Sequence, residues 1–192
     1  MKKILSLLIV ALATLGQVHA QKAIDVIPIN EIFDLITYRY ITLANEDADA
    51  TAVIENYTKH FKAYGYVNEL VGEGYGGPCS IIDGFHKGGV NDKDNYEFIP
   101  TDPVAASTVV ISACNDGESS DYGYIHVELT LYSRTLLADV LDQLSMGGFT
   151  QFDYDNPSNE SDAETMLFYN GNKQVRITIV DNNVFVDCGI AQ

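Results

Sequence analysis

Histidines close to carboxylates are the side chains of this sequence best suited to acid–base chemistry. His126 and Glu128 are separated by one residue in YGYIHVELTL, where apolar and polar residues alternate. Side chains two positions apart on a strand share a face, so this pair could move a proton to or from a substrate. Any exposed strand can also bring the two residue types together without chemistry. Asp83 and His86 lie in the glycine-rich segment VGEGYGGPCSIIDGFHKGGVNDKD. One hypothesis is therefore a hydrolase-like enzyme built around that segment.

Recognised catalytic motifs do not support this hypothesis. The sequence has neither G-x-S-x-G nor H-E-x-x-H, the patterns of a serine nucleophile elbow and of a zinc protease. GEGYGG resembles a phosphate-binding loop but lacks the Lys-Ser/Thr that follows it in such loops. We therefore predict no cofactor, no metal ligand set and no catalytic residue, and an enzyme is the less favoured interpretation.

Calcium is a third possibility, raised by DYDNPSNESDAE from Asp153 to Glu164. It has aspartates at positions 1 and 3 and a glutamate at position 12, as in an EF-hand loop, but Pro157 and Ser158 stand where a ligand and a glycine are required. An EF-hand is disfavoured. A looser site in a calcium-binding envelope or adhesion protein stays open.

Cysteine content and the N-terminus together indicate where the protein is located. MKKILSLLIVALATLGQVHA combines two lysines, a short apolar run and a small-residue ending, which is typical of a secretory signal peptide spanning residues 1–20. The sequence thus predicts a secreted or periplasmic protein. In such an oxidising compartment three cysteines suggest one disulfide and one thiol. We expect Cys79 to pair with Cys114, and Cys188 to be a buried thiol.

The charge of the chain restricts its partners. Without residues 1–20, the basic residues number 11 − 2 = 9 against 27 acidic ones, a net charge of −18. Such a surface repels phosphate groups, which argues against nucleic acid and anionic membrane surfaces. No later segment is long and apolar enough for membrane insertion. A protein partner or a cationic ligand remains possible, and the oligomeric state is unknown.

Two helix ends of the same type recur 83 residues apart. Gly65 and Gly148 each follow a helical pattern and precede an aromatic residue, with Phe61 and Leu144 at the position that touches this residue in a Schellman ending. Ser133 suits the N-cap of the second helix. An extra N-terminal helix is expected from Asn30 to Ala44, and a strand over TYRYITL is the alternative.

Four strands are expected after each helix. Those of the first half are Tyr66 to Val71, Asn95 to Ile99, Thr108 to Cys114 and Tyr124 to Tyr132, and those of the second are Phe149 to Tyr154, Glu164 to Tyr169, Lys173 to Val180 and Val184 to Cys188. The glycine-rich segment is expected as an insertion between the first two strands. Asn170-Gly171 and Asp181 to Asn183 are hairpin signals.

These elements predict an α+β protein of two layers, formed by tandem duplication of a helix followed by a four-stranded antiparallel sheet. The first half spans residues 21–132 and the second residues 133–192. This plan resembles that of the β-lactamase-inhibitor protein, whose open sheet face grips an enzyme. The resemblance is one of architecture: it implies a binding role and assigns no residues, and this chain has no tryptophan.

Alternation along the strands predicts one buried and one exposed face for each sheet. Tyrosine and arginine are enriched in interfaces, so we favour a non-enzymatic binding module that recognises a protein or small ligand through the polar faces. A solvated face without a partner is the plain alternative. The candidate binding residues, including two from the glycine-rich segment, are Tyr124, His126, Glu128, Tyr132, Arg176, Tyr75 and His86.

Overall fold

The computed structural model describes residues 26–44, 50–69, 79–92, 94–95, 97–115, 122–155 and 163–190. The predicted signal peptide and Tyr75 lie outside these residues, as does Asp49, which the sequence suggests, with its near neighbours, as the N-cap of the helix that ends at Gly65. No helix in the described ranges is both long and apolar enough to span a bilayer.

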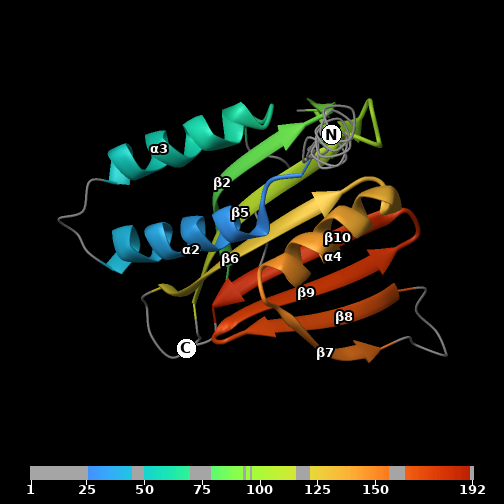
Figure 1. The fold of residues 1–192 in the computed structure, drawn as a ribbon. Coiled ribbons are helices and arrows are strands. Elements are labelled where there is room, and N and C mark those ends of the chain that lie inside the picture. The colour runs from blue at the N-terminus through green and yellow to red at the C-terminus, as the bar shows by residue number, and fades with distance from the viewer. Residues whose placement is uncertain are drawn as a thin grey trace, which may run out of the picture.

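The fold is α+β, as predicted. Figure 1 shows helices on one face of a large antiparallel sheet. The helices are α2 (Ile29–Ala44), α3 (Ala50–Ala63) and α4 (Leu137–Met146), the last preceded by the 3-10 turn η1 (Arg134–Leu136). The strands of the sheet are β1 (Val67–Asn68), β2 (Cys79–Lys87), β5 (Ser107–Asn115), β6 (Tyr122–Leu131), β7 (Thr150–Asp155), β8 (Ala163–Asn170), β9 (Lys173–Val180) and β10 (Asn183–Ile190).

The eight strands form one continuous sheet, where two four-stranded sheets were expected. Their order is β1-β2-β5-β6-β10-β9-β8-β7, so each group of four follows the chain from its outer edge inward. The last strands of the two groups, β6 and β10, pair antiparallel from Leu131 opposite Val184 to His126 opposite Gly189. Backbone hydrogen bonds therefore join the two groups at the centre of the sheet.

The glycine-rich segment differs from its prediction. Its residues Cys79–Lys87 form β2, a full strand of the main sheet, and the predicted strand Asn95 to Ile99 contributes β4 (Glu97–Pro100) to a separate hairpin with β3 (Gly89–Asp92). The alternation in CSIIDGFHK was obscured because the register shifts between Ile81 and Asp83, and such a bulge moves the following side chains to the opposite face.

Both predicted helix ends have the Schellman pattern. The N–H of Tyr66 donates to the carbonyl of Phe61 at 3.1 Å, and that of Phe149 donates to Leu144 at 2.9 Å. Gly65 and Gly148 have φ values of +84° and +75°, a left-handed conformation that glycine adopts without steric cost. At the start of the second helical segment the Ser133 side chain accepts from the N–H of Thr135, which confirms the N-cap.

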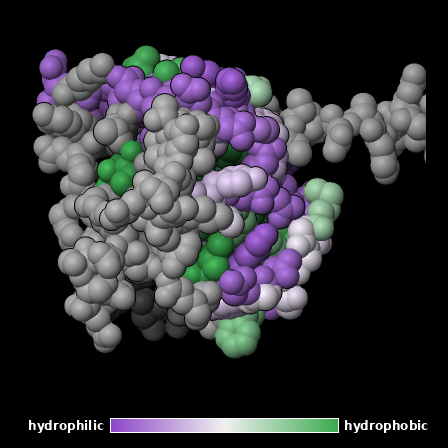
Figure 2. All heavy atoms as spheres, turned by 90° about the vertical axis from the view of Figure 1, so that its left-hand side faces the viewer, coloured by the Kyte–Doolittle hydropathy of each residue, from purple (hydrophilic) through white to green (hydrophobic). Residues whose placement is uncertain are grey.

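The apolar face of the sheet and the helices enclose one core. Buried side chains from both groups of strands contribute to it, among them Phe85, Ile111, Leu129, Ile177 and Val186. From the helix layer come Phe33, Leu35, Phe61 and Leu144, all at most 2 % exposed. Figure 2 shows that hydrophilic side chains make up most of the coloured surface on one side of the molecule, as expected when the apolar residues are enclosed.

The β3–β4 hairpin covers part of the polar face of the sheet. Its Phe98 is 6 % exposed and its ring lies 5.4 Å from that of His86 and 5.1 Å from that of Tyr132. Gly88 permits the approach, because its φ is +69° and a Cβ atom there would meet Ala106 Cα at 2.7 Å. The polar face of the first group of strands is consequently not open, contrary to the prediction.

Candidate functional site on the open half of the sheet

The polar face divides into a covered and an open half. In the first group of strands, its side chains His86, Thr108, Ser112 and Thr130 are at most 6 % exposed. In the second group, by contrast, Gln174 and Arg176 are exposed and Tyr169 and Asp187 partly so. We call the polar face of β10, β9 and β8, together with His126 and Glu128 of the adjoining β6, the open half, and it holds the candidate site.

A row of charged residues crosses the open half. Asp187 on β10 lies directly opposite Glu128 on β6 and, on its other side, opposite Arg176 on β9. Arg176 in turn lies opposite Leu167 on β8. Directly opposed residues in an antiparallel sheet have Cβ atoms about 5 Å apart, so two carboxylates and one guanidinium group share a short stretch of surface.

His126 adds a second cationic group when it is protonated. Its Nε2 lies 3.3 Å from Oδ1 of Asp187, and the two side chains are 34 % and 27 % exposed. Asp187 is thus the central acceptor of the site, flanked by His126 and by the predicted binding residue Arg176. His126 and Arg176 were among the predicted binding residues, whereas Asp187, the carboxylate between them, was not.

A hollow of about 570 Å³ lies over these residues. Its walls include the side chains His126, Leu167, Tyr169, Gln174, Arg176 and Asp187. The walls combine an apolar side chain, an aromatic ring, an amide and charges of both signs. Such a surface can bind a complementary partner by hydrogen bonds and ion pairs.

An exposed aromatic pair stands beside the hollow. Phe152 on β7 is 79 % exposed, and its ring meets Tyr169 edge to face with centroids 5.6 Å apart. The register of β7 shifts between Gln151 and Asp153, so Phe152 sits at a bulge. A large exposed phenylalanine next to a polar hollow is typical of a contact surface.

Glu128 is a perturbed carboxyl group. Burial and then the negative charge of Asp187 raise its pKa, while a hydrogen bond from Thr130 and the nearby His126 lower it. The Thr130 hydroxyl donates to Glu128 Oε1 at 3.3 Å. Because its pKa is raised, the Glu128 carboxyl group can take up a proton when a partner brings a further negative charge.

Two further predicted binding residues, His86 and Tyr132, are not part of this site. His86 is buried, with Nε2 3.3 Å from Glu69, and it packs with Tyr132 against Phe98. Burial is the main cause that raises the pKa of Tyr132. Tyr124 lies on β6 opposite Cys114, but its side chain, like Tyr75, is outside the described residues.

The residues considered for a hydrolase do not lie together in the structure. His86 pairs with Thr108 and Thr108 with Thr130, four residues along β6 from His126, so the Cα atoms of the two histidines are roughly 16 Å apart. Asp83 accepts a hydrogen bond from the Tyr57 hydroxyl of α3. Asp83 therefore engages the helix layer, on the far side of the sheet from His126.

The residues that the structure describes provide no set of calcium ligands. Glu164, the expected twelfth ligand, accepts two hydrogen bonds from Arg134 at 2.8 and 2.9 Å. Residues 156–162 of the acidic loop lie outside the described residues. Among the residues with a described placement, no group of three or more His, Cys, Asp or Glu side chains could hold a metal ion.

Asp187, Tyr169 and Phe152 were not among the predicted binding residues. Asp187 alternates with apolar neighbours in NVFVDCGI, and Tyr169 does so in AETMLFYN, so alternation alone placed both on the polar face. Their importance depends on the pairing of β10 with β6 and β9, which no local pattern reveals. Phe152 was assigned a regular strand position, and the bulge changed its environment.

Comparison with known proteins adds no relative: no protein-family model, curated protein or solved structure matches this chain.

Proposed function

We propose that this protein is a secreted or periplasmic binding module without enzymatic activity, which recognises another protein through the open half of its sheet. The observation that carries the proposal is the contrast between the two halves of the polar face. The polar side chains of one half are buried, in part beneath the hairpin, whereas the other half presents His126, Asp187 and Arg176 beside the exposed Phe152–Tyr169 pair.

A protein partner suits this surface better than a small molecule. The wall residues of the hollow come from four neighbouring strands of one sheet, and the exposed Phe152 with its ring partner Tyr169 extends this surface beyond the hollow. Aromatic and arginine side chains carry much of the binding energy in protein interfaces. Phe152, Tyr169 and Arg176 are the proposed anchors, and the acidic chain favours a partner with a basic contact surface.

The finer description of the fold is also a proposal, that of a tandem duplication. Its support is the recurrence of a Schellman ending at an offset of 83 residues, in Phe61 to Tyr66 and Leu144 to Phe149. Each helix end leads into an outer strand, and each group of four strands ends at the central β6·β10 pair. Two copies of one unit related by an approximate twofold axis would give this strand order.

The cysteines support the proposed oxidising compartment. Cys114 is disulfide-bonded, Cys188 is a buried free thiol, and Cys79 is the residue directly opposite Cys114 in the β2·β5 register. Opposed residues of antiparallel strands have Cα atoms about 4.5 to 5.5 Å apart, within the range that a disulfide spans. The signal peptide prediction points to the same compartment.

The test is affinity capture from the native envelope or medium fraction, followed by reconstitution with the purified partner. We expect Phe152→Ala and Arg176→Ala each to weaken binding by about 30-fold, the factor of a hot-spot residue. Met146→Ala is the matched control for Phe152→Ala, because Met146 on α4 is 78 % exposed but lies in the helix layer. A partner that both site variants retain at full affinity would defeat the proposal.

A further inference from the structure

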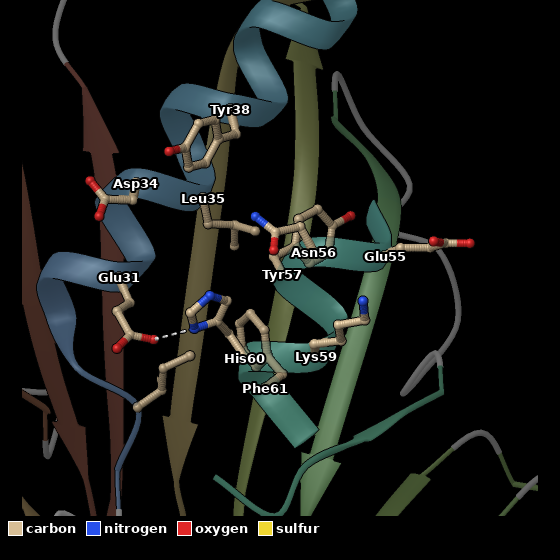
Figure 3. Close-up of a pocket in the computed structure, with 11 residues that line it drawn as sticks. Glu31, Asp34, Leu35, Tyr38, Glu55, Asn56, Tyr57, Lys59, His60 and Phe61 are labelled. Carbon is tan, nitrogen blue, oxygen red and sulfur yellow. Dashed lines mark ion pairs between the residues drawn. The ribbon is translucent and has the colours of Figure 1, made fainter. Parts of the chain in front are cut away.

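A second hollow lies on the opposite side of the sheet, between α2 and α3. It has a volume of about 560 Å³, within the range of pockets that hold small molecules. Figure 3 shows residues of the two helices on either side of it, with Leu35 of α2 directed toward α3. We call this hollow the helix groove.

The floor of the helix groove is apolar and fixed. Ile27, Leu35 and Phe61 line it and are at most 2 % exposed as members of the core. Tyr57 is held by a hydrogen bond from its hydroxyl to Asp83. Tyr38, which is 52 % exposed, stands at the rim. Because these floor side chains are already covered, a ligand with an aromatic or alkyl body would lie above them, against the exposed ring of Tyr38, without rearranging the core.

One carboxylate oxygen at the helix groove is buried without a hydrogen-bond partner. Glu31 Oε1 accepts from the Tyr64 hydroxyl at 2.7 Å, but Glu31 Oε2 has no hydrogen-bond partner. His60 Nδ1 lies 3.9 Å from this oxygen, drawn as a dashed line in Figure 3, which is beyond hydrogen-bond distance. An unmet buried acceptor is unfavourable, so a donor placed there would be stabilising.

Tyr64, which donates a hydrogen bond to Glu31 Oε1, keeps its proton. Burial, followed by the hydrogen bond to Glu31 and its negative charge, raises the pKa of Tyr64 to about 12. The Tyr64 proton is therefore retained at neutral pH and fixes the orientation of the Glu31 carboxylate. The second oxygen is left for a different donor.

The charges around the helix groove favour a cation as that donor. Its lining includes the carboxylates Glu31, Asp34 and Glu55 against one lysine, Lys59. Figure 3 shows Lys59 and Glu55 pointing to the side of α3 away from α2, while Glu31 and His60 point toward one another. The centre of the helix groove is consequently negative, and its floor apolar.

We propose that the helix groove binds a small organic cation, a primary ammonium group joined to an aromatic or alkyl body. The ammonium group displaces the exposed ring of His60 to reach the buried Glu31 Oε2, and the body lies over the apolar floor against Tyr38. This site is independent of the proposed protein contact, since it lies in the helix layer and shares no residue with the open half.

The test is titration calorimetry of the purified protein with three probes of equal length: 4-phenylbutylamine, 4-phenylbutan-1-ol and 4-phenylbutanoate. We expect the amine to bind about tenfold more tightly than the alcohol, because both can donate a hydrogen bond to Glu31 but only the amine carries a charge of opposite sign. The carboxylate should bind most weakly. Equal affinity for amine and alcohol would overturn the proposal, because the negative charge of Glu31 would then contribute nothing.

Variants locate the site. Glu31→Gln keeps the acceptor for Tyr64 and removes the charge, so amine affinity should fall about tenfold while alcohol affinity stays within about twofold. Tyr38→Ala should weaken both probes. Asp142→Asn, an exposed position on α4, removes the same charge elsewhere and should change neither. An equal loss of amine affinity in Asp142→Asn and Glu31→Gln would show attraction to the whole acidic surface and would also overturn the proposal.

Discussion

Glu128 connects the open half of the sheet to the stability of the fold. Its carboxyl group is partly buried beside Asp187, and burial is the first cause of its raised pKa. A carboxyl group with a raised folded pKa binds its proton more tightly in the folded than in the unfolded chain. Its stabilising effect is present below the unfolded pKa and is lost as pH rises through the folded pKa.

We predict that Glu128→Gln raises the melting temperature at pH 7 by roughly 2 °C. The amide cannot ionise and keeps an oxygen for the Thr130 hydroxyl, so the cost of the buried charge disappears. Thermal unfolding at pH 7 and at pH 3.5 measures this. The difference between variant and wild type should vanish at pH 3.5, where the carboxyl group is protonated in both states. A gain that persists at pH 3.5 would contradict the explanation.

The cysteines give a second prediction. Cys188 is fully buried, and burial followed by the charge of Asp187 raises the pKa of its thiol. We expect no labelling of the native protein by iodoacetamide at pH 8 and one labelled site after denaturation without reductant. Two further sites should appear after reduction. Labelling of Cys188 in the native protein would contradict the burial of this side chain in the structure.

The predicted Cys79–Cys114 bond also has an expected energetic effect. The positions are 114 − 79 = 35 residues apart, so the Cys79→Ser, Cys114→Ser double variant should lose about 3 to 4 kcal/mol of unfolding free energy. Urea unfolding measures the loss. Wild-type stability in the double variant would mean that the pair is not closed in the native protein.

The β3–β4 hairpin determines how much of the polar face is open. It is held over the first group of strands by Phe98, whose ring contacts His86 and Tyr132, and by the hydrogen bonds from the N–H groups of Thr101 and Asp102 to the carbonyl of Gly88. A hairpin of two four-residue strands is not stable by itself. Its position therefore depends on this one aromatic anchor and on its base.

We predict that Phe98→Ala releases the hairpin and lowers the free energy of unfolding by about 3 kcal/mol, the usual loss for a buried phenylalanine. Amide exchange of β3 and β4 should increase more than that of β5. Ile99→Ala is the matched control, since the neighbouring side chain points the other way and is 44 % exposed. It should change stability by less than about 0.5 kcal/mol. Equal effects of the two variants would show that the Phe98 contacts do not hold the hairpin.

The β6·β10 junction makes the two groups of strands one folding unit. Backbone pairing crosses it along six residue pairs, and the apolar side chains on both sides belong to a single core. Neither group has a separate hydrophobic layer. Cooperative loss of the whole structure is expected when the junction is weakened.

We predict that Leu129→Ala, at a fully buried position opposite Val186, lowers the free energy of unfolding by about 2 to 5 kcal/mol. Native-state hydrogen exchange should show the same loss at Ile111 on β5 and at Ile177 on β9. Val104→Ala, at a position 60 % exposed, should show no comparable change. Loss confined to the first group would contradict a single unit.

Local signals of the sequence correctly predicted the parts of the fold that depend on a few neighbouring residues. The helix ends follow from glycines that adopt positive φ, and the strands of the second group from alternation between clear turns. The merging of the sheet and the covering hairpin depend on residues far apart in the chain, so no local pattern contains them. For the same reason His126 and Arg176 were selected, while Asp187 between them was not.

The two outer edges of the sheet are both unfavourable to the addition of another strand. β1 has only two residues, and the register of β7 shifts at Gln151 and Asp153, which interrupts the regular row of backbone donors and acceptors. Proteins use short and bulged edge strands to prevent fibril-like stacking between copies. The two features disfavour growth of the sheet by stacking at β1 and β7, which agrees with the proposed contact surface on the face of the sheet rather than at its edges.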